Sequence, residues 1–211
     1  MAIETVRGRE FVIHFDGRRC IHSRNCVLDR PDVFVPNVKG DWIYPDRASP
    51  EGISQLAHNC PSGAIRYERV DGSVGETPPL VNTVRVRENG PLAINAPLVI
   101  EGAEQGLRAT LCRCGQSKRK PYCDGSHTAA GFAATGEPPQ KDSQALEIRN
   151  GPVSITPKLN GPLLVSGSLE VVSGTGRTIN RVTRATFCRC GHSANKPYCD
   201  GSHARVGFSS E

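Results

Sequence analysis

Four side chains of the kinds that bind metals occur twice in this chain at the same spacing. The first set is Cys112, Cys114, Cys123 and His127, and the second is Cys188, Cys190, Cys199 and His203. Each member of the second set lies 76 residues after its counterpart, and the surrounding sequence repeats as CRCGQSKRKPYCDGSH and CRCGHSANKPYCDGSH. Cysteine and histidine are the usual ligands of zinc and of iron in proteins. The spacing therefore predicts two copies of one metal site.

The repetition extends beyond these side chains. Asn89–Ile94 corresponds to Asn150–Ile155, and Pro97–Gly102 corresponds to Pro162–Gly167. The second repeat is longer, and most of its extra residues lie between Gly167 and Arg184. Repeats of this length bury little surface alone. We therefore expect the two to pack about a pseudo-two-fold axis and to share one core.

We expect these matched blocks to form short strands separated by turns. Asn-Gly-Pro turns separate the apolar blocks, and apolar and polar side chains alternate in Thr83–Arg87 and Ala145–Arg149. Alternation of this kind is typical of half-buried strands. We predict a β-rich repeat with a strand in each of these two ranges.

The N-terminal segment differs from the repeats. We predict a strand at Glu10–Phe15, a short helix opened by Ser49-Pro50-Glu51 that runs through Leu56 and Ala57, and a strand at Ala64–Glu68. Val70–Pro79 and Glu137–Asp142 are rich in linker residues. The predicted class is α+β, with a small α+β domain at 1–72 and the repeats at 80–136 and 143–211.

The composition limits how such domains can be stabilised and where the chain works. Hydrophobic residues make up 37% and aromatic residues 5%, which is little for one large core, while nine cysteines could bind metal. An odd number of cysteines argues against complete disulfide pairing. The sequence has no secretory signal and no run of about 20 apolar residues. We expect a reduced, cytoplasmic protein without a membrane anchor.

The net charge is +5, and basic residues gather near the repeats. One interpretation is a solvated surface that offsets anionic clusters, and the other is a docking rim for an acidic redox partner. Nucleic acid is not expected, because no basic strand with aromatic residues accompanies the charge. The basic residues concerned are Arg108, Arg113, Lys118, Arg119, Lys120, Arg177, Arg181, Arg184, Arg189, Lys196 and Arg205.

The local pattern brings three thiolates and one imidazole together. Asp124 is a suitable N-cap for a short helical turn that places Cys123 and His127 on one side. Such a set suits a tetrahedral zinc ion or a [2Fe–2S] cluster with one histidine ligand. The single residue between Cys112 and Cys114 is shorter than the usual zinc spacing, which favours iron and sulfide. Spacing alone leaves both open.

The string C-R-C-G-x-S-x-x-K-P-Y-C-D-G-S-H resembles the CDGSH iron–sulfur domain of the mitoNEET-like family. The resemblance covers both repeats. It implies that each set of three cysteines and one histidine binds a [2Fe–2S] cluster. Eukaryotic members are homodimers with a membrane anchor, whereas this chain resembles the tandem type, in which one chain supplies both halves. We therefore expect a monomer with an internal pseudo-two-fold axis.

The N-terminal cysteines Cys20, Cys26 and Cys60 form a separate group. Cys20 and Cys26 keep the outer spacing of a C-x2-C-x2-C ferredoxin run, with Ser23 in the middle position, and Cys60-Pro61 resembles the closing Cys-Pro. Residues 9–69 resemble a divergent single-cluster ferredoxin domain. Three thiolates imply a [3Fe–4S] cluster, or a [4Fe–4S] cluster if His22 or Ser23 supplies a fourth ligand. A ferredoxin-like fold without a cluster is the alternative.

These observations predict an iron–sulfur protein that transfers electrons to a redox partner or donates clusters to an apo-acceptor. No nucleophile and base are recognisable, so we do not expect an enzyme. The histidine ligands predict a higher reduction potential than four thiolates give, and loss of the cluster in mild acid. The alternatives are a zinc-binding structural or interaction module and the redox subunit of a larger oxidoreductase.

Overall fold

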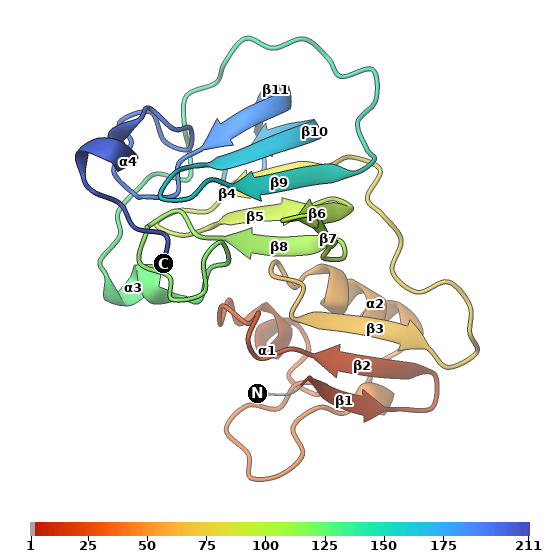
Figure 1. Cartoon of the computed structure of the whole chain (residues 1–211). Coiled ribbons are helices and arrows are strands. Elements are labelled where there is room, and N and C mark those ends of the chain that lie inside the picture. Colours follow the sequence, from red (N-terminus) through yellow and green to blue (C-terminus); the bar gives the residue numbers. More distant parts are fainter. Residues whose placement is uncertain (1–2) are drawn as a thin grey trace. The chain divides into compact units, whose positions relative to one another are not determined.

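The computed structural model describes residues 3–211, which form two compact units, Met1–Thr77 and Pro78–Glu211 (Figure 1). We call them the N-terminal unit and the repeat unit. The protein is a mixed α+β protein, rich in strands and with few, short helices. The N-terminal unit contains β1 (Glu4–Arg7), β2 (Phe11–Phe15), α1 (Asn25–Asp29), the 3-10 helix η1 (Pro45–Arg47), α2 (Pro50–His58) and β3 (Ile65–Arg69).

The N-terminal unit is an antiparallel sheet in the order β1-β2-β3, with α2 packed against it. Helix α2 begins at Pro50 because the Ser49 hydroxyl accepts a hydrogen bond from the Gly52 amide (3.2 Å). Ile53 and Leu56 are buried with the side chains of β2 and β3. The predicted helix and both predicted strands are confirmed to within one residue at each end.

The repeat unit contains one mixed sheet in the order β7-β6-β9-β10-β4-β5-β8, and β11 pairs with β10. In this sheet β9 and β10 of the second repeat lie between strands of the first repeat, with β6 and β7 on one side and β4, β5 and β8 on the other. Its elements are β4 (Thr83–Val86), β5 (Leu92–Asn95), β6 (Leu98–Ile100), β7 (Ala103–Glu104), β8 (Arg108–Leu111), α3 (Ser126–Ala129), β9 (Val153–Pro157), β10 (Leu163–Val172), β11 (Thr178–Phe187) and α4 (Ser202–Arg205).

Two parallel pairings join the repeats. Strand β6 of the first repeat pairs with β9 of the second, and the end of β10 pairs with β4, with Glu170 opposite Thr83. Apolar side chains from both repeats fill one buried cluster, including Leu92 and Leu111 from the first and Leu163 and Phe187 from the second. The hydrophobic core is therefore shared between the repeats.

The prediction of a strand at Ala145–Arg149 is wrong. These residues have no regular secondary structure. In the first repeat β4 pairs with the next strand, β5, but in the second repeat the next strand, β9, already pairs with β6 along one edge and with β10 along the other. No edge of β9 is therefore free for Ala145–Arg149. The segment is held instead at its end, where the Arg149 carbonyl oxygen accepts a hydrogen bond from the Asn82 amide (2.7 Å).

The extra residues of the second repeat lengthen the β10–β11 hairpin, whose strands have ten residues each. The Glu170 side chain is buried in this hairpin. Its carboxylate lies 2.8 Å from Arg149 Nη2 and accepts a hydrogen bond from the Thr178 hydroxyl (3.1 Å). A buried carboxylate needs such partners, and they fix the hairpin against the segment that enters the second repeat.

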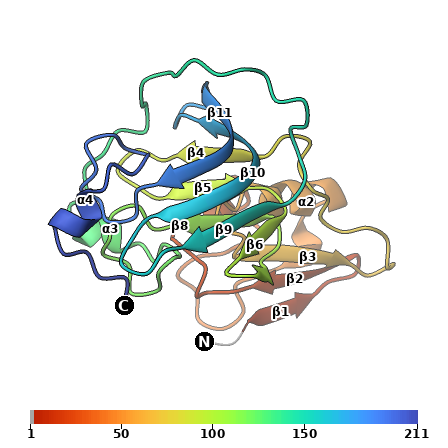
Figure 2. The same ribbon diagram turned by 45° about the horizontal axis from the view of Figure 1, so that its top comes forward.

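Helices α3 and α4 lie at the same end of the repeat unit, where β8 and β11 end (Figure 2). None of the helices within residues 3–211 has the length and hydropathy needed to cross a membrane. The short helices instead follow the two loops that contain the predicted ligands.

Candidate metal centres

The end of β8 positions the first ligand set. Beyond Leu111 the chain makes a loop and returns beside the strand, because the Cys112 amide donates to the Pro121 carbonyl (2.8 Å) and the Cys123 amide donates to the Thr110 carbonyl (2.9 Å). The end of β11 does the same in the second repeat, with Cys188 bonded to Pro197 (2.8 Å) and Cys199 to Thr186 (2.9 Å). The third cysteine of each set is thereby brought back to the first two.

An aspartate stabilises each ligand loop by accepting hydrogen bonds from backbone amides. Asp124 accepts hydrogen bonds from the amides of Ser126 (3.0 Å) and Lys118 (2.9 Å). Asp200 accepts the equivalent bonds from Ser202 (3.0 Å) and Ala194 (2.9 Å). Although burial opposes it, these hydrogen bonds lower the pKa of Asp124 to about 2. The carboxylate therefore stays charged and holds the loop throughout the neutral range.

The predicted helix cap at Asp124 needs correction by one residue. The N-cap of α3 is Gly125 at φ 88°, and the N-cap of α4 is Gly201 at φ 85°. A positive φ strongly favours glycine over residues with a Cβ. Helix α3 places His127 beside Cys123, as the spacing predicted.

The donor atoms of each set form two close pairs. Cys112 Sγ lies 3.7 Å from Cys114 Sγ, and Cys123 Sγ lies 3.4 Å from His127 Nδ1. The second set has the same values, 3.7 Å for Cys188 and Cys190 and 3.4 Å for Cys199 and His203. Within residues 3–211, no three or more His, Cys, Asp or Glu side chains meet around a single ion position.

Backbone amides point at the sulfur atoms. The Gln116 amide donates to Cys114 Sγ and the Gly125 amide to Cys123 Sγ, each at 3.4 Å. His192 and Gly201 donate in the same way to Cys190 (3.5 Å) and Cys199 (3.4 Å). Such donors stabilise negative charge on sulfur, whether as free thiolate or as a metal ligand.

The cysteine pKa values reflect burial and pairing. A hydrogen bond between the two sulfurs lowers the pKa of Cys112 and raises the pKa of Cys114. Burial raises the pKa of Cys123 to about 11 and lowers the pKa of His127. Burial makes it costly to deprotonate the thiols and to protonate the imidazole. A bound cation would offset the first cost, because it stabilises thiolates beside a neutral imidazole.

The loops that carry the two ligand sets pack against each other. A Cβ on Gly115 would lie 2.7 Å from the Cys190 carbonyl oxygen, and a Cβ on Gly191 would lie 2.7 Å from the Cys114 carbonyl oxygen. Both glycines have positive φ values, 81° and 86°. The loops of the two ligand sets are therefore neighbours, which the sequence alone did not reveal.

Part of the basic surface predicted from sequence is not on the surface. Arg108, Arg113 and Arg189 are buried, with exposed fractions of 5%, 1% and 3%. These three contribute to neither a solvated surface nor a docking rim. The burial of Arg113 and Arg189 could have been predicted from their position between the first two cysteines of each repeat.

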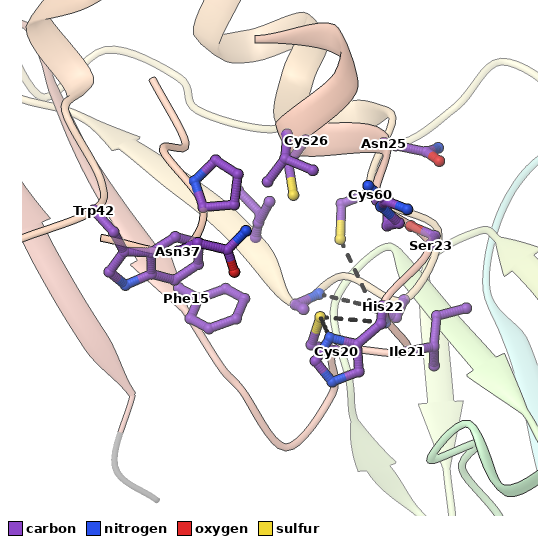
Figure 3. A pocket seen from close by; sticks show the side chains of 16 residues that line it. Phe15, Cys20, Ile21, His22, Ser23, Asn25, Cys26, Asn37, Trp42 and Cys60 are labelled. Atoms are coloured by element: carbon purple, nitrogen blue, oxygen red, sulfur yellow. Dashed lines mark hydrogen bonds between the residues drawn. The ribbon is translucent and has the colours of Figure 1, made fainter. Parts of the chain in front are cut away.

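The N-terminal cysteines line one cavity of about 590 Å³. Figure 3 shows Cys20, Cys26 and Cys60 extending into it, with the Asn37 amide across from them. The His22 amide donates to Cys20 Sγ (3.4 Å), and His22 Nδ1 lies 3.9 Å from that sulfur. Burial, followed by the charge of Cys60, raises the pKa of Cys26 to about 11. The structure thus brings the three predicted cysteines together.

The backbone around this cavity is unusual. His22, Arg24 and Asn37 all line it and have positive φ values of 53°, 64° and 61°. Non-glycine residues in this conformation are uncommon and gather at functional sites. The sequence analysis missed Asn37, which lies far along the chain from any cysteine and carries no ligand motif.

Comparison with protein families assigns both parts of the chain. Residues 89–128 and 160–204 each match the family described as "Iron-binding zinc finger CDGSH type", and both matches contain all four predicted ligands. The chain carries two CDGSH repeats. Residues 6–70, upstream of the CDGSH repeats, match "Divergent 4Fe-4S mono-cluster".

Curated relatives agree with the CDGSH assignment. CDGSH iron-sulfur domain-containing protein 1 of Rattus norvegicus is 29% identical over 90 residues, which cover 43% of this chain and 73% of the relative. The protein of the same name from Mus musculus gives the same values. The family supports binding of iron–sulfur clusters by the CDGSH repeats.

Proposed function

We propose that the repeat unit holds two [2Fe–2S] clusters, one on each set of three cysteines and one histidine. The observation that carries the proposal is the division of each donor set into two close pairs. A tetrahedral metal with bonds of about 2.3 Å to sulfur and about 2.0 Å to nitrogen places two sulfurs about 3.8 Å apart and a sulfur and nitrogen about 3.5 Å apart. The distances of 3.7 and 3.4 Å in the structure fit one metal for each pair.

One zinc ion would require all four donors to meet around one point. Two irons joined by sulfide require two pairs, which is the arrangement that both repeats have. The donor chemistry fits as well, because thiolates and imidazole are the known ligands of [2Fe–2S] clusters. The same division in two repeats of different length argues against coincidence.

A bound [2Fe–2S] cluster would supply one-electron chemistry at each site. The protein's own groups hold it, exclude water and set its electrostatics. The cysteines of the first set are buried, and amide donors face their sulfurs. His127 and His203 are half-buried, and in the first set the imidazole is the one ligand that is not buried. That edge is suited to electron exchange with a partner or to release of a cluster.

We propose that the chain works as a carrier, not as an enzyme, and that it exchanges electrons with a redox partner or gives clusters to an apo-acceptor. The shared core and the opposed loops support an intramolecular pseudo-dimer in which one chain performs the role of two. Neither nucleic acid nor membrane is part of this proposal. Work in the reducing cytoplasm would suit nine free cysteines.

We also propose a third cluster, [3Fe–4S] or [4Fe–4S], on Cys20, Cys26 and Cys60. The cavity they share and the left-handed backbone at His22 and Arg24 support it. The match of residues 6–70 to a mono-cluster family supports iron and sulfide there.

Reductive titration of the anaerobically purified chain, followed by EPR, tests the proposal. We expect a coloured protein that takes up one electron at each CDGSH repeat and gives the EPR signal of a reduced [2Fe–2S] cluster. A colourless protein that takes up no electrons would refute it and favour the zinc module. Incubation with an apo-ferredoxin separates the two roles, because only a cluster donor loses iron to it. Co-purification with a flavin or molybdenum protein would make the chain a redox subunit.

A further inference from the structure

The second ligand set is more accessible to solvent than the first. In the first set His127 is the one ligand that is not buried, whereas in the second set both Cys199 and His203 are half-buried. Electron transfer between proteins slows steeply as the distance between the redox centres grows. The surface around His203 is therefore the one from which a redox partner would come closer to a bound cluster.

Two large apolar side chains are exposed on this part of the repeat unit. Val206 lies three residues after His203 and is 45% exposed. Leu159 lies in the turn between β9 and β10 and is 75% exposed. At the position that matches Val206, three residues after His127, the first repeat has the much smaller Ala130.

Hydrogen bonds hold these two apolar side chains at one end of the repeat unit (Figure 2). The amide of Asn160, next to Leu159, donates to the Ser210 hydroxyl (3.0 Å), and the Ser210 amide donates back to Asn160 Oδ1 (2.9 Å). Ser210 follows Val206 by four positions, a stretch of chain that spans about 14 Å at most. Both apolar side chains therefore fit within the footprint of about 600 Å² per partner of an electron-transfer encounter.

The counterpart of Leu159 in the first repeat is an acidic residue. The buried arginine of each repeat donates to two carbonyls of one turn, those of Arg87 and Gly90 in the first repeat and those of Lys158 and Gly161 in the second. Position 88 is therefore the structural counterpart of position 159, and it holds Glu88. The sequence analysis paired Asn89 with Asn150, whereas these contacts pair Asn89 with Asn160.

Basic side chains surround the two apolar ones. Lys158 and Arg205 are exposed and directly adjoin the apolar residues in the chain. Lys120 of the first ligand loop reaches the second repeat, where its Nζ lies 5.9 Å from the centre of the Phe208 ring. The Phe208 amide in turn donates to the carbonyl of the ligand His203 (3.0 Å). The second ligand set therefore has positive charge from both repeats beside it.

The same end of the repeat unit has a hollow of about 330 Å³. Lys118 and Lys120 line it together with Ser210 and Glu211, and the Glu211 carboxylate offsets part of the lysine charge. The basic residues of the first ligand loop are thus placed next to the segment that follows α4. They extend the positive surface around Val206.

The first ligand set has different surroundings. The two ligand loops contact each other reciprocally, so the loop of the second repeat takes the equivalent place beside the first set. That loop has Ala194 and Asn195 where the other has Lys118 and Arg119, and its Lys196 donates to a carbonyl of its own loop (2.6 Å). The combination of apolar and basic side chains therefore distinguishes the second set from the first.

We propose that the surface around Leu159 and Val206, which we call the docking face, binds an acidic electron-transfer protein that reduces the cluster of the second ligand set. The inference rests on the proposed function, since it needs a cluster on that set. One electron leaves the partner's redox centre and enters this cluster, and no bond forms or breaks. Lys158, Arg205 and Lys120 attract the acidic partner, and the apolar centre excludes water from the contact.

An acidic plant-type [2Fe–2S] ferredoxin is the probe, because its low potential favours electron flow to a cluster with a histidine ligand. Stopped-flow mixing of the reduced ferredoxin with the oxidised full chain gives a second-order rate constant. We expect this rate constant to fall as the ionic strength rises, because salt screens the attraction between opposite charges. A basic cytochrome c, offered as an acceptor to the reduced chain, should show the opposite dependence on salt.

Val206→Glu and Ala130→Glu form a matched pair, because they place the same charge three residues after the histidine of each repeat. Val206→Glu is expected to lower the rate constant about tenfold at low ionic strength. Leu159→Glu should do the same, and Ala130→Glu should change the rate constant by less than about twofold. All three positions are exposed, and unchanged visible and EPR spectra show that the clusters are intact.

Equal slowing by Val206→Glu and Ala130→Glu would overturn the assignment to the second ligand set. A rate constant that responds neither to salt nor to any of the three variants would remove the docking face altogether. A dimer of this chain that Val206→Glu dissociates would make the face a contact between copies instead. If the parent chain holds zinc and no redox-active cluster, the proposed function fails, whereas a redox-active chain that ignores these variants refutes only the docking face.

Discussion

Gly115 lies so close to Cys190 that a Cβ at position 115 would stand 2.7 Å from the Cys190 carbonyl oxygen. The reverse contact, from Gly191 to Cys114, has the same distance. A ligand-bearing loop of one repeat thus forms part of the wall against which the other loop packs. Disturbance at one site is expected to reach the other.

Gly115→Ala should destabilise the repeat unit and both of its sites. The positive φ of 81° costs about 1 kcal/mol with a Cβ present, and the clash with backbone adds about 1–3 kcal/mol. Gly125→Ala is the matched control, because its φ is 88° but no atom lies within 4 Å of its Cβ position. Denaturant unfolding should show a clearly larger loss for Gly115→Ala. Equal losses in the two variants would contradict the close packing of the loops.

His127→Cys combined with His203→Cys should lower both reduction potentials of the repeat unit, by roughly 100 mV or more, because a fourth thiolate adds negative charge to each cluster. The double variant should also retain its clusters between pH 7 and 5. His192→Gln is the control, since Gln116 occupies the matching position in the first repeat. Redox titration and visible absorbance against pH provide the measurements. An unchanged acid lability in the double variant would mean that the histidines are not the weak point.

The loop aspartates should not determine the acid lability. The pKa of Asp124 is lowered to about 2, and backbone hydrogen bonds, led by that from Ala194, lower the pKa of Asp200. A lowered carboxyl pKa gives stability that is present above the ordinary value near 4 and is lost only as the pH falls toward the folded-state value. Asp124→Asn should therefore speed cluster release at every pH from 7 to 5 without moving the midpoint of acid loss. A midpoint shift toward neutral pH in this variant would count against the assignment to histidine.

Burial of the imidazole also makes the protein less stable in acid, but in a higher pH window. Burial lowers the pKa of His127 below its ordinary value, so the unfolded chain takes up the proton first as the pH falls. Stability is then lost below about pH 6.5, which lies inside the range of mild acid. The histidine and the aspartate therefore contribute to acid sensitivity in separate pH windows.

Ser23→Cys should convert the N-terminal ligand set from three thiolates to four. Ser23 occupies the position of the missing cysteine and lines the same cavity as Cys20, Cys26 and Cys60. We expect the iron content of this site to rise from three to four, with loss of the [3Fe–4S] EPR signal of the oxidised protein. Cys60→Ser is the counterpart and should remove this iron while the signals of the repeat unit remain. A Cys60→Ser variant with unchanged iron content would show that the cavity holds no cluster.

Local signals in the sequence predicted much of the fold. The Ser49 cap and the Pro50 start predicted α2, alternating side chains predicted β4, and strands were also predicted where β2 and β3 lie. The parallel pairings of β6 with β9 and of β10 with β4 join residues far apart in the chain, and no local pattern encodes them. Ala145–Arg149 alternates as well as β4 does, yet β9 had no free edge to pair with it.

The candidate sites show the same division. The spacing of the ligands identified which side chains belong to one site. The backbone hydrogen bonds at the ends of β8 and β11 bring those side chains together in space. The sequence analysis counted Arg113 and Arg189 among the surface charges, because a count of basic residues does not tell a buried arginine from an exposed one. Their hydrogen bonds to carbonyl oxygens become visible only when the loops are folded.

Metal and acid-labile sulfide analysis of the freshly purified full chain tests the central claim most directly. Two [2Fe–2S] clusters require four irons and four sulfides per chain from the repeats, and a loaded N-terminal site raises the iron to seven or eight. Two zinc ions per chain, with neither iron nor sulfide, would contradict the account.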